Sequence, residues 1–365
     1  MKEDLLYKIA ITKIAKVGPV TARNLISYCG GVKNVFHAGK NKLLKVPGVG
    51  ALTISNLLSK NVLIEAEKEI KFIEKNDIQS FFFLDKDYPQ RLKHYQDSPI
   101  LLYYKGVADL NFPRIVAIVG TRKPTINGKS ICEEIVEGLS TYNVLIVSGL
   151  AYGIDVVAHQ RSLDLNIPTI GVLGHGMSQI YPPKHKRIAQ QMQNCGGILT
   201  EFSSDESVER EHFPMRNRII AGMSDALVVV ETAEKGGSMI SAHLANNFSK
   251  DVFAVPGRLN DKNSQGCNHL IKTHKASLIE SAEDIAYILR WDKKSDRKSV
   301  QKSLFIELSE NEQQIINLLK DVEDLSIDKL SKQIQLNSSK MAELMLDLEF
   351  KGIIKTLPGK RYVLT

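Results

Sequence analysis

The sequence has no apolar run long enough to cross a membrane and no recognisable secretion signal. No stretch of its 365 residues approaches the ~20 consecutive apolar residues of a membrane-spanning helix. The N-terminal segment MKEDLLYKIAITK lacks an uninterrupted apolar core followed by a small-residue cleavage site. Apolar residues make up 43% and charged residues 24%, proportions that exclude a disordered chain, a collagen repeat and a coiled-coil rod. We therefore expect a cytoplasmic globular protein without membrane contact.

Cysteine is scarce, and its spacing predicts no cross-link or metal centre. The chain contains four cysteines far apart in sequence, and none forms a C-x-x-C pair. We expect all of them to be small apolar residues in a reducing compartment. They are Cys29, Cys132, Cys195 and Cys267.

Three common enzyme signatures are also missing. No G-x-x-x-x-G-K-[ST] occurs, so a P-loop nucleotide triphosphatase is not predicted. The G-x-S-x-G elbow of many hydrolases is absent. The turn G-T-R-K-P-T at 120–125 differs from the G-x-G-x-x-G fingerprint of dinucleotide-binding domains.

Positive charge is concentrated at the N-terminus. The net charge is +7 overall, and residues 1–75 alone hold 13 Lys and Arg against six Asp and Glu. Residues 304–365 hold eight basic and ten acidic residues. A basic N-terminal module fits a polyanionic partner. A lysine-rich surface that faces only solvent would give the same excess of basic residues. The acidic C-terminal module argues against non-specific phosphate binding there.

Residues 1–75 are predicted to form a helical domain. Two segments, starting at Val17-Gly18-Pro19 and at Val46-Pro47-Gly48, place glycine turns between apolar helical patterns. This resembles the helix-hairpin-helix motif, whose turn exposes backbone N–H groups to a phosphate. Such hairpins also serve only for packing or protein contact, and both alternatives stay open.

The middle of the chain predicts a Rossmann-like, doubly wound α/β domain with a mostly parallel sheet. Residues 76–112 are expected to form a connecting region with one or two strands. Within residues 113–290, apolar runs typical of strands buried on both faces alternate with helix-length segments. The six strand candidates are Arg114–Val119, Val144–Val147, Thr169–Leu173, Ile198–Phe202, Ala226–Glu231 and Val252–Val255.

The C-terminal part predicts a linker and a winged helix. Residues 291–303 are polar and charged, as a linker is. Within 304–365, Ser309 and Glu312 fit a capping box, and three amphipathic segments precede a hairpin with a Pro-Gly turn. A winged helix usually reads duplex DNA with its third helix. That helix is acidic here, so we favour protein contact or packing over base reading.

In open α/β sheets, ligands bind outside the carboxyl ends of the strands. Nearly every strand candidate here ends in a glycine turn that leads into a helix, where unpaired N–H groups attract anions. Hydroxyl, basic and aromatic side chains follow these turns and can hold phosphates and stack on bases. The predicted site residues are Gly120, Thr121, Arg122, Lys184, Phe213, Arg216, Asn217, Arg218, Gly236, Gly237 and Ser238, and Tyr181 is a further candidate for stacking on a base.

Two features near this edge have structural alternatives. Asp155 and His159, four residues apart on one predicted helix, are expected to form a polar cap rather than a catalytic pair. The Arg-Asn-Arg at 216–218 can tie loops together, but its aromatic neighbour and the nearby glycine turns favour a binding role.

Six segments of the chain, which follow one another in the family's order, resemble the DprA/Smf family of DNA-processing proteins. They are VAIVGTRKPTINGK (116–129), VSGLAYGIDVVAH (147–159), IGVLGHG with IYPP (170–183), FPMRNRIIAGMSDALVVVE (213–231), GGSMISA (236–242) and VFAVPG (252–257). The flanking modules fit the family too, which often carries a helical sterile-alpha-motif-like or helix-hairpin-helix domain before the α/β domain and a winged helix after it. The chain departs from it at His185, where the family usually has Asn, and at 270–276, which lacks glycine.

The resemblance implies a non-enzymatic protein with no catalytic residue, cofactor or metal. The family binds and protects single-stranded DNA and loads a RecA-type recombinase onto it during natural transformation. A homodimer is also implied. By motif, the resemblance assigns DNA binding to the same site residues that the strand ends select.

One enzymatic alternative remains. The α/β domain resembles, more distantly, phosphoribohydrolases that release a base from a nucleoside monophosphate. Those enzymes follow a glycine-glycine turn closely with a catalytic glutamate, whereas Gly236-Gly237-Ser238 is followed by MISAH without a carboxylate. Glu201 and Glu231 are the only candidates left for that role.

Overall fold

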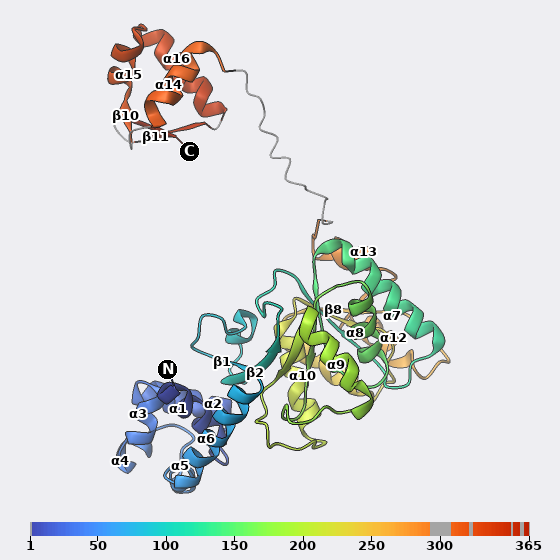
Figure 1. Cartoon of the computed structure of the whole chain (residues 1–365). Helices are drawn as coiled ribbons and strands as arrows, with labels where there is room; N and C mark the ends of the chain where they lie inside the picture. Colours follow the sequence, from blue (N-terminus) through green and yellow to red (C-terminus); the bar gives the residue numbers. More distant parts are fainter. Residues whose placement is uncertain (1, 293–307, 321–323, 352, 358–360, 365) are drawn as a thin grey trace. The chain divides into compact units, whose positions relative to one another are not determined.

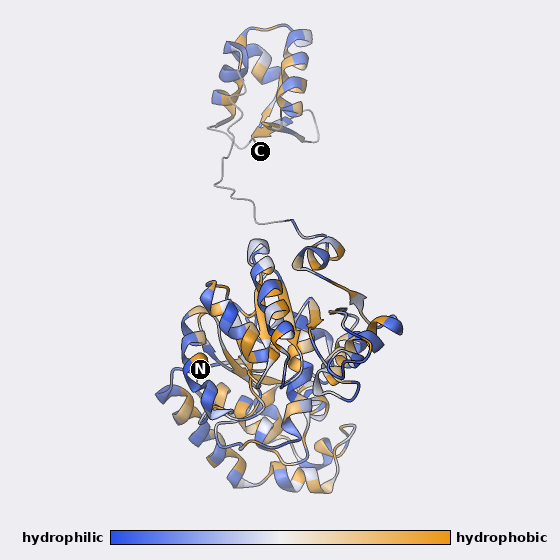
Figure 2. Cartoon of the chain, turned by 90° about the vertical axis from the view of Figure 1, so that its right-hand side faces the viewer, coloured by the Kyte–Doolittle hydropathy of each residue, from blue (hydrophilic) through white to orange (hydrophobic). Residues whose placement is uncertain are grey.

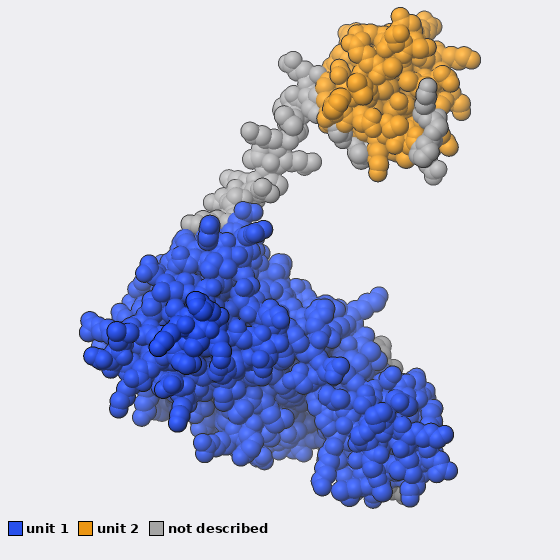
Figure 3. Space-filling view, turned by 180° about the vertical axis from the view of Figure 1, so that it is seen from behind, with its two compact units in different colours: residues 1–294 blue, residues 295–365 orange. Residues whose placement is uncertain are grey.

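The computed structural model describes residues 2–292, 308–320, 324–351, 353–357 and 361–364. The chain divides into two compact units, residues 1–294 and 295–365 (Figure 3). From residue 293 onward the predicted linker lies outside the described residues. Among the described helices, none is long and apolar enough to span a membrane.

The first unit is built on a nine-stranded sheet whose centre is parallel. Its order is β1-β2-β6-β5-β4-β3-β7-β8-β9, and neighbours from β6 to β9 run parallel. The strands are β1 (Gln79–Phe82), β2 (Leu101–Gly106), β3 (Ile115–Val119), β4 (Leu145–Ser148), β5 (Thr169–Val172), β6 (Gly197–Thr200), β7 (Ala226–Val229), β8 (Asp251–Ala254) and β9 (Ser277–Leu278). The Rossmann-like, mostly parallel fold and all six strand candidates are confirmed.

Helices cover both faces of this sheet, so its central strands are apolar along their whole length (Figures 1 and 2). One face carries α7 (Ile126–Leu139), α8 (Ile154–Asp164), α9 (Lys186–Cys195) and α13 (Ala282–Ile288). The other carries α10 (His212–Met223), α11 (Gly237–Asn247) and α12 (Gln265–Lys272). Short 3-10 turns lie at Gln90–His94 (η2), Ser140–Tyr142 (η3) and Pro183–His185 (η4).

The strand order reverses at β3. From β3 the chain adds β4, β5 and β6 on one side, and then returns to add β7, β8 and β9 on the other. The connections leaving β3 and β7 therefore diverge, and a crevice opens outside their carboxyl ends. This is the place where the fold itself favours a ligand.

The N-terminal helices pack against the sheet's antiparallel edge. They are α1 (Lys2–Ala10), η1 (Ile11–Lys13), α2 (Pro19–Cys29), α3 (Val32–His37), α4 (Lys40–Leu43), α5 (Ala51–Leu57) and α6 (Lys60–Lys75). Their apolar core includes Phe82 of β1 and Leu101 and Tyr103 of β2. The helical prediction is confirmed, as are the two strands in 76–112. Both strands join the main sheet, because β2 pairs antiparallel with β6.

The second unit has the winged-helix arrangement, as predicted. It contains α14 (Glu310–Lys320), β10 (Leu325–Ser326), α15 (Ile327–Ile334), α16 (Ser338–Phe350), β11 (Ile354–Leu357) and β12 (Arg361–Leu364). The capping box is present, since Ser309 N–H donates to Glu312 and Glu312 N–H donates to Ser309 Oγ. The predicted Pro-Gly turn at 358–359 lies outside the described residues.

Candidate nucleic-acid site

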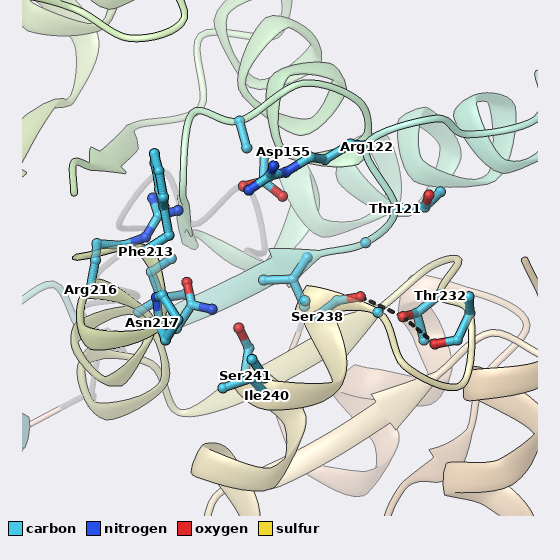
Figure 4. A pocket seen from close by; sticks show the side chains of 18 of the residues that line it. Thr121, Arg122, Asp155, Phe213, Arg216, Asn217, Thr232, Ser238, Ile240 and Ser241 are labelled. Atoms are coloured by element: carbon cyan, nitrogen blue, oxygen red, sulfur yellow. Dashed lines mark hydrogen bonds between the residues drawn. The ribbon is translucent and has the colours of Figure 1, made fainter. Parts of the chain in front are cut away.

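A cavity of about 800 Å³ lies at the carboxyl ends of β3 and β7, where the strand order reverses. Its walls are the turn after β3, the loop after β7, the first half of α10 and the start of α11 (Figure 4). The crevice that the topology favours is therefore present as a defined pocket.

Nine of the eleven predicted site residues line this cavity. They are Gly120, Thr121, Arg122, Phe213, Arg216, Asn217, Gly236, Gly237 and Ser238. The other two do not line it: Lys184 lies exposed in η4, and Arg218 is paired with the carboxylate of Glu201. The structure thus brings together residues from three separate segments, 120–122, 213–217 and 236–238. Which of them contact a ligand stays a prediction.

The turn after β3 is held by its own backbone bonds. Thr121 N–H donates to the carbonyl of Glu231 at 2.6 Å, and Ile154 N–H donates to the carbonyl of Thr121 at 3.2 Å. A Cβ on Gly120 would lie 2.5 Å from Ile154, so the turn and α8 touch closely. The backbone N–H of Thr121 therefore already has an acceptor within the protein. It shapes the wall of the cavity and is not available to a ligand.

At the start of α11, Met239 N–H donates to the carbonyl of Gly236 at 3.1 Å, which leaves the N–H groups of Gly237 and Ser238 as donors for a ligand. Gly236 is its N-cap and supplies no side-chain hydrogen bond. The first N–H groups of a helix have no intrahelical acceptor, and the helix dipole adds positive potential there. Ser238 Oγ donates to Thr232 Oγ1 at 2.7 Å, which fixes the turn (Figure 4). A Cβ on Gly237 would meet no heavy atom of the described residues within 4 Å, so a ligand can approach this backbone closely.

Arg216 forms the floor of the cavity and is almost completely buried, with 4% of its surface exposed. Its Nη1 donates to the carbonyl of Gly149 at 2.6 Å and also to that of Val172, so it joins the ends of β4 and β5. Burial lowers the pKa of Arg216 to about 10, while nearby Asp155 opposes that shift. Its Nε has no hydrogen-bond partner among the described residues.

Exposed cations and aromatic rings form the rim. The guanidinium of Arg122 lies 5.7 Å from the centre of the Phe213 ring, a cation–π distance. Tyr181 lies beside Phe213, with ring centres 6.0 Å apart. Arg210 and Lys235 are exposed and line the same cavity. Neither residue is among the predicted site residues, although Lys235 directly precedes the Gly236-Gly237 turn.

The acidic and imidazole groups near the site are engaged in structural bonds. Glu231 accepts from Thr125 N–H at 2.9 Å and Thr125 Oγ1 at 2.5 Å. Asp155 accepts from Gly149 N–H at 3.1 Å, and burial raises the pKa of its carboxyl. His159 is fully buried against Thr169 Oγ1 at 2.7 Å.

His185, where the chain departs from the resembled pattern, bonds the carbonyl of Leu150 at 2.8 Å. Within the described ranges, no group of three or more His, Cys, Asp or Glu residues could hold a metal ion. Among the four cysteines, Cys195 is partly exposed and the others are buried.

The fold and the site define a class: a doubly wound α/β protein with an anion-compatible cavity at its switch point, carrying a winged helix in the same chain. More narrowly, the chain belongs to the DNA recombination-mediator protein A family, whose model matches residues 79–290. The DprA winged helix domain matches residues 305–360.

Several characterised sequences are similar to this chain. Protein Smf of Synechocystis is 36% identical over 272 residues, which cover 73% of this chain and 68% of that protein. DNA processing protein DprA of Streptococcus pneumoniae is 41% identical over 207 residues, covering 56% of this chain and 72% of that protein.

Two solved structures are also similar. The X-ray structure of S. pneumoniae DprA has a TM-score of 0.63 and 32% identity, covering 79% of this chain and 98% of that one. A Helicobacter pylori DprA structure, reported for its single-stranded DNA binding mode, has a TM-score of 0.53 and 30% identity. It covers 58% of this chain and 95% of its own.

Proposed function

We propose that this chain binds and protects single-stranded DNA in the switch-point cavity and loads a RecA-type recombinase onto it, without catalysing a reaction. The observation that carries the proposal is the composition of the cavity. Exposed Arg122, Arg210 and Lys235 line it together with Phe213 of α10 and the start of α11. Cations and helix N–H groups suit phosphates, and aromatic rings suit unstacked bases. The H. pylori relative's single-stranded DNA binding supports the same conclusion.

A single strand fits this site better than a duplex does. A base can reach Phe213 and Tyr181 inside a cavity of about 800 Å³ only when it is unstacked from its neighbours. Stacking on aromatic rings tolerates any base, so binding should depend little on sequence.

Binding without catalysis is supported by the state of the carboxylates. Glu231 is held by Thr125, and Glu201 is paired with Arg218. Each of the two candidates for the single catalytic glutamate of the base-releasing alternative is therefore engaged by a neighbouring side chain. Chromatography of nucleoside monophosphates incubated with the protein would revive that alternative if free base appeared.

The binding site is tested by fluorescence anisotropy of a labelled oligonucleotide, single-stranded and duplex. We expect Arg122→Gln to weaken single-strand binding about tenfold and to lower the salt slope by about 0.7, the value for one lost phosphate contact. Lys275→Gln is the matched control. Lys275 precedes β9 and so lies at the amino-terminal edge of the parallel strands, whereas the cavity lies at their carboxyl edge. Equal affinity of wild type and Arg122→Gln, or affinity that ignores salt, would contradict the proposal.

A homodimer and recombinase loading complete the proposed function. Two cavities on one strand would raise affinity through avidity. We expect a dimer in sedimentation equilibrium at micromolar concentration. We also expect the protein to speed the onset of single-strand-dependent ATP hydrolysis by a RecA-type recombinase when the strand is already coated. A monomer would contradict the proposed dimer. An unchanged onset of ATP hydrolysis would contradict recombinase loading.

A further inference from the structure

A second cavity of about 510 Å³ lies next to the switch-point cavity and shares one side chain with it. Arg122 lines both. The rest of the second cavity is formed by Lys123, by Lys129 on α7, and by Tyr152 with the first turn of α8. The two cavities therefore adjoin at Arg122.

The lining of this second cavity is basic and contains no carboxylate. Lys123 and Lys129 are both exposed, and neither has an ion-pair partner in the part of the chain that the structure describes. The apolar side chains of Val156 and Val157 are partly exposed at the same place. Unpaired cations beside an apolar surface suit a ligand that alternates phosphates with flat apolar groups.

Tyr152 supplies an aromatic surface in this cavity. Its ring makes an edge contact with His185, with centres 5.0 Å apart, while 41% of the residue's surface remains exposed. His185 is itself buried and bonded to the carbonyl of Leu150 at 2.8 Å. The tyrosine ring is thus supported on a fixed base and still open to a stacking partner.

We propose that this cavity is a second nucleotide subsite for the same single strand, in which a base stacks on Tyr152 and Lys123 and Lys129 hold the adjoining phosphates. The inference rests on the proposed function, because Arg122 joins this subsite to the first cavity. A strand long enough to pass Arg122 occupies both subsites, whereas a short strand occupies only the first.

The test compares oligothymidylates of about four and about 16 nucleotides, a range spanned by single-strand binding sites. We expect Tyr152→Leu to weaken binding of the long strand about tenfold, the loss that removal of one stacked base produces. Lys129→Gln should lower the salt slope for the long strand by about 0.7. Both variants should bind the short strand as the wild type does.

The controls separate this inference from the proposed function. Tyr287→Leu, at an exposed position of α13, and Lys275→Gln should bind both strands like the wild type. Variants Tyr152→Leu and Lys129→Gln that match the wild type on the long strand would overturn the second subsite alone. Equal losses on both strands would overturn it too. A wild type that binds neither strand would overturn both proposals.

A fluorescent reporter gives a second readout that does not depend on removing the ring. The chain has a single tryptophan, Trp291, so Tyr152→Trp in a Trp291→Phe background places one emitter in the cavity. The long strand should quench its emission by stacking, and the short strand should not. Quenching by neither strand, while anisotropy shows binding of the long one, would overturn the inference.

Discussion

Arg122 and Arg216 line the same cavity, but one is exposed and the other is buried under the ends of β4 and β5. The exposed guanidinium is free to meet a ligand. The buried one already serves two backbone carbonyls, and its removal would leave those acceptors without a partner. The two residues therefore call for different experiments.

We expect Arg216→Gln to lower the free energy of unfolding by about 2–4 kcal/mol, because it breaks charged, buried hydrogen bonds. Arg122→Gln should change that free energy by less than about 0.5 kcal/mol, as exposed substitutions usually do. Urea unfolding of both variants beside the wild type measures this. An Arg216→Gln protein as stable as the wild type would show that the buried bonds are dispensable.

His159 gives the fold a pH dependence of defined sign. Burial, together with the electrostatic effect of His185 and Arg216, lowers the pKa of His159 to about 3. In the unfolded chain a histidine has a pKa near 6.5. Between these values the unfolded chain binds the additional proton, so this residue makes stability fall as the pH falls below about 6.5. The loss from this residue should reach about 2 kcal/mol at pH 5.

We expect a His159→Gln variant to lose this dependence, since glutamine does not titrate. The measurement is the free energy of unfolding at several pH values for both proteins, and the difference between the two curves isolates His159 from the other titrating groups. A difference that stays constant between pH 7 and 5 would contradict the assignment.

For single residues, the sequence predicted most of those that line the cavity but not the role of each side chain in it. The aromatic neighbour and the nearby glycine turns indicated a binding role for the motif at 216–218, but Arg216 is buried and bonded to backbone carbonyls. Its acceptors, the carbonyls of Gly149 and Val172, are known only once β4 and β5 are placed side by side. Lys235 adjoins the predicted Gly236-Gly237 turn, whereas Arg210 belongs to no predicted motif, and only the fold brings it to the rim.

At the scale of elements, the central strands were predictable because burial on both faces demands continuous apolar sequence. The run IVAIV of β3 is an example, since every residue in it is buried. The place of β1 and β2 was not predictable. Their apolar runs indicate strands, but which strand they pair with depends on the whole sheet, and β2 pairs with β6 about a hundred residues away.

At the start of α11, the open space beside Gly237 predicts that a ligand approaches the backbone closely. Gly237 has an ordinary helical neighbourhood and open space at its Cβ, so Gly237→Ala should leave the free energy of unfolding unchanged or slightly higher. The added methyl group projects into the cavity and should weaken single-strand binding about tenfold, equal to about 1.4 kcal/mol.

Anisotropy together with urea unfolding checks this pair of expectations. Gly39→Ala is the matched control, because its Cβ would also meet no heavy atom of the described residues within 4 Å and it lies at the start of α4, away from the cavity. Unchanged DNA binding by Gly237→Ala would mean that no ligand approaches this turn closely.

At the scale of the whole molecule, the two compact units carry different surfaces. The first holds both cavities and most of the basic excess. On the second, the exposed side of α16 carries the Lys340–Glu343 ion pair and exposes Leu346 and Phe350. An acidic and apolar helix is a poor reader of the major groove, whose phosphates and bases call for basic and amide side chains.

We therefore expect a chain that ends at residue 303 to bind duplex DNA within about twofold of the full chain and to keep its preference for single strands. The first unit has its own cores, so the shortened chain should also retain a cooperative unfolding transition. Anisotropy with matched single-stranded and duplex probes, beside thermal unfolding, measures both. If duplex binding falls at least tenfold while the shortened chain stays folded, the winged helix reads duplex DNA and its acidic helix does not prevent it.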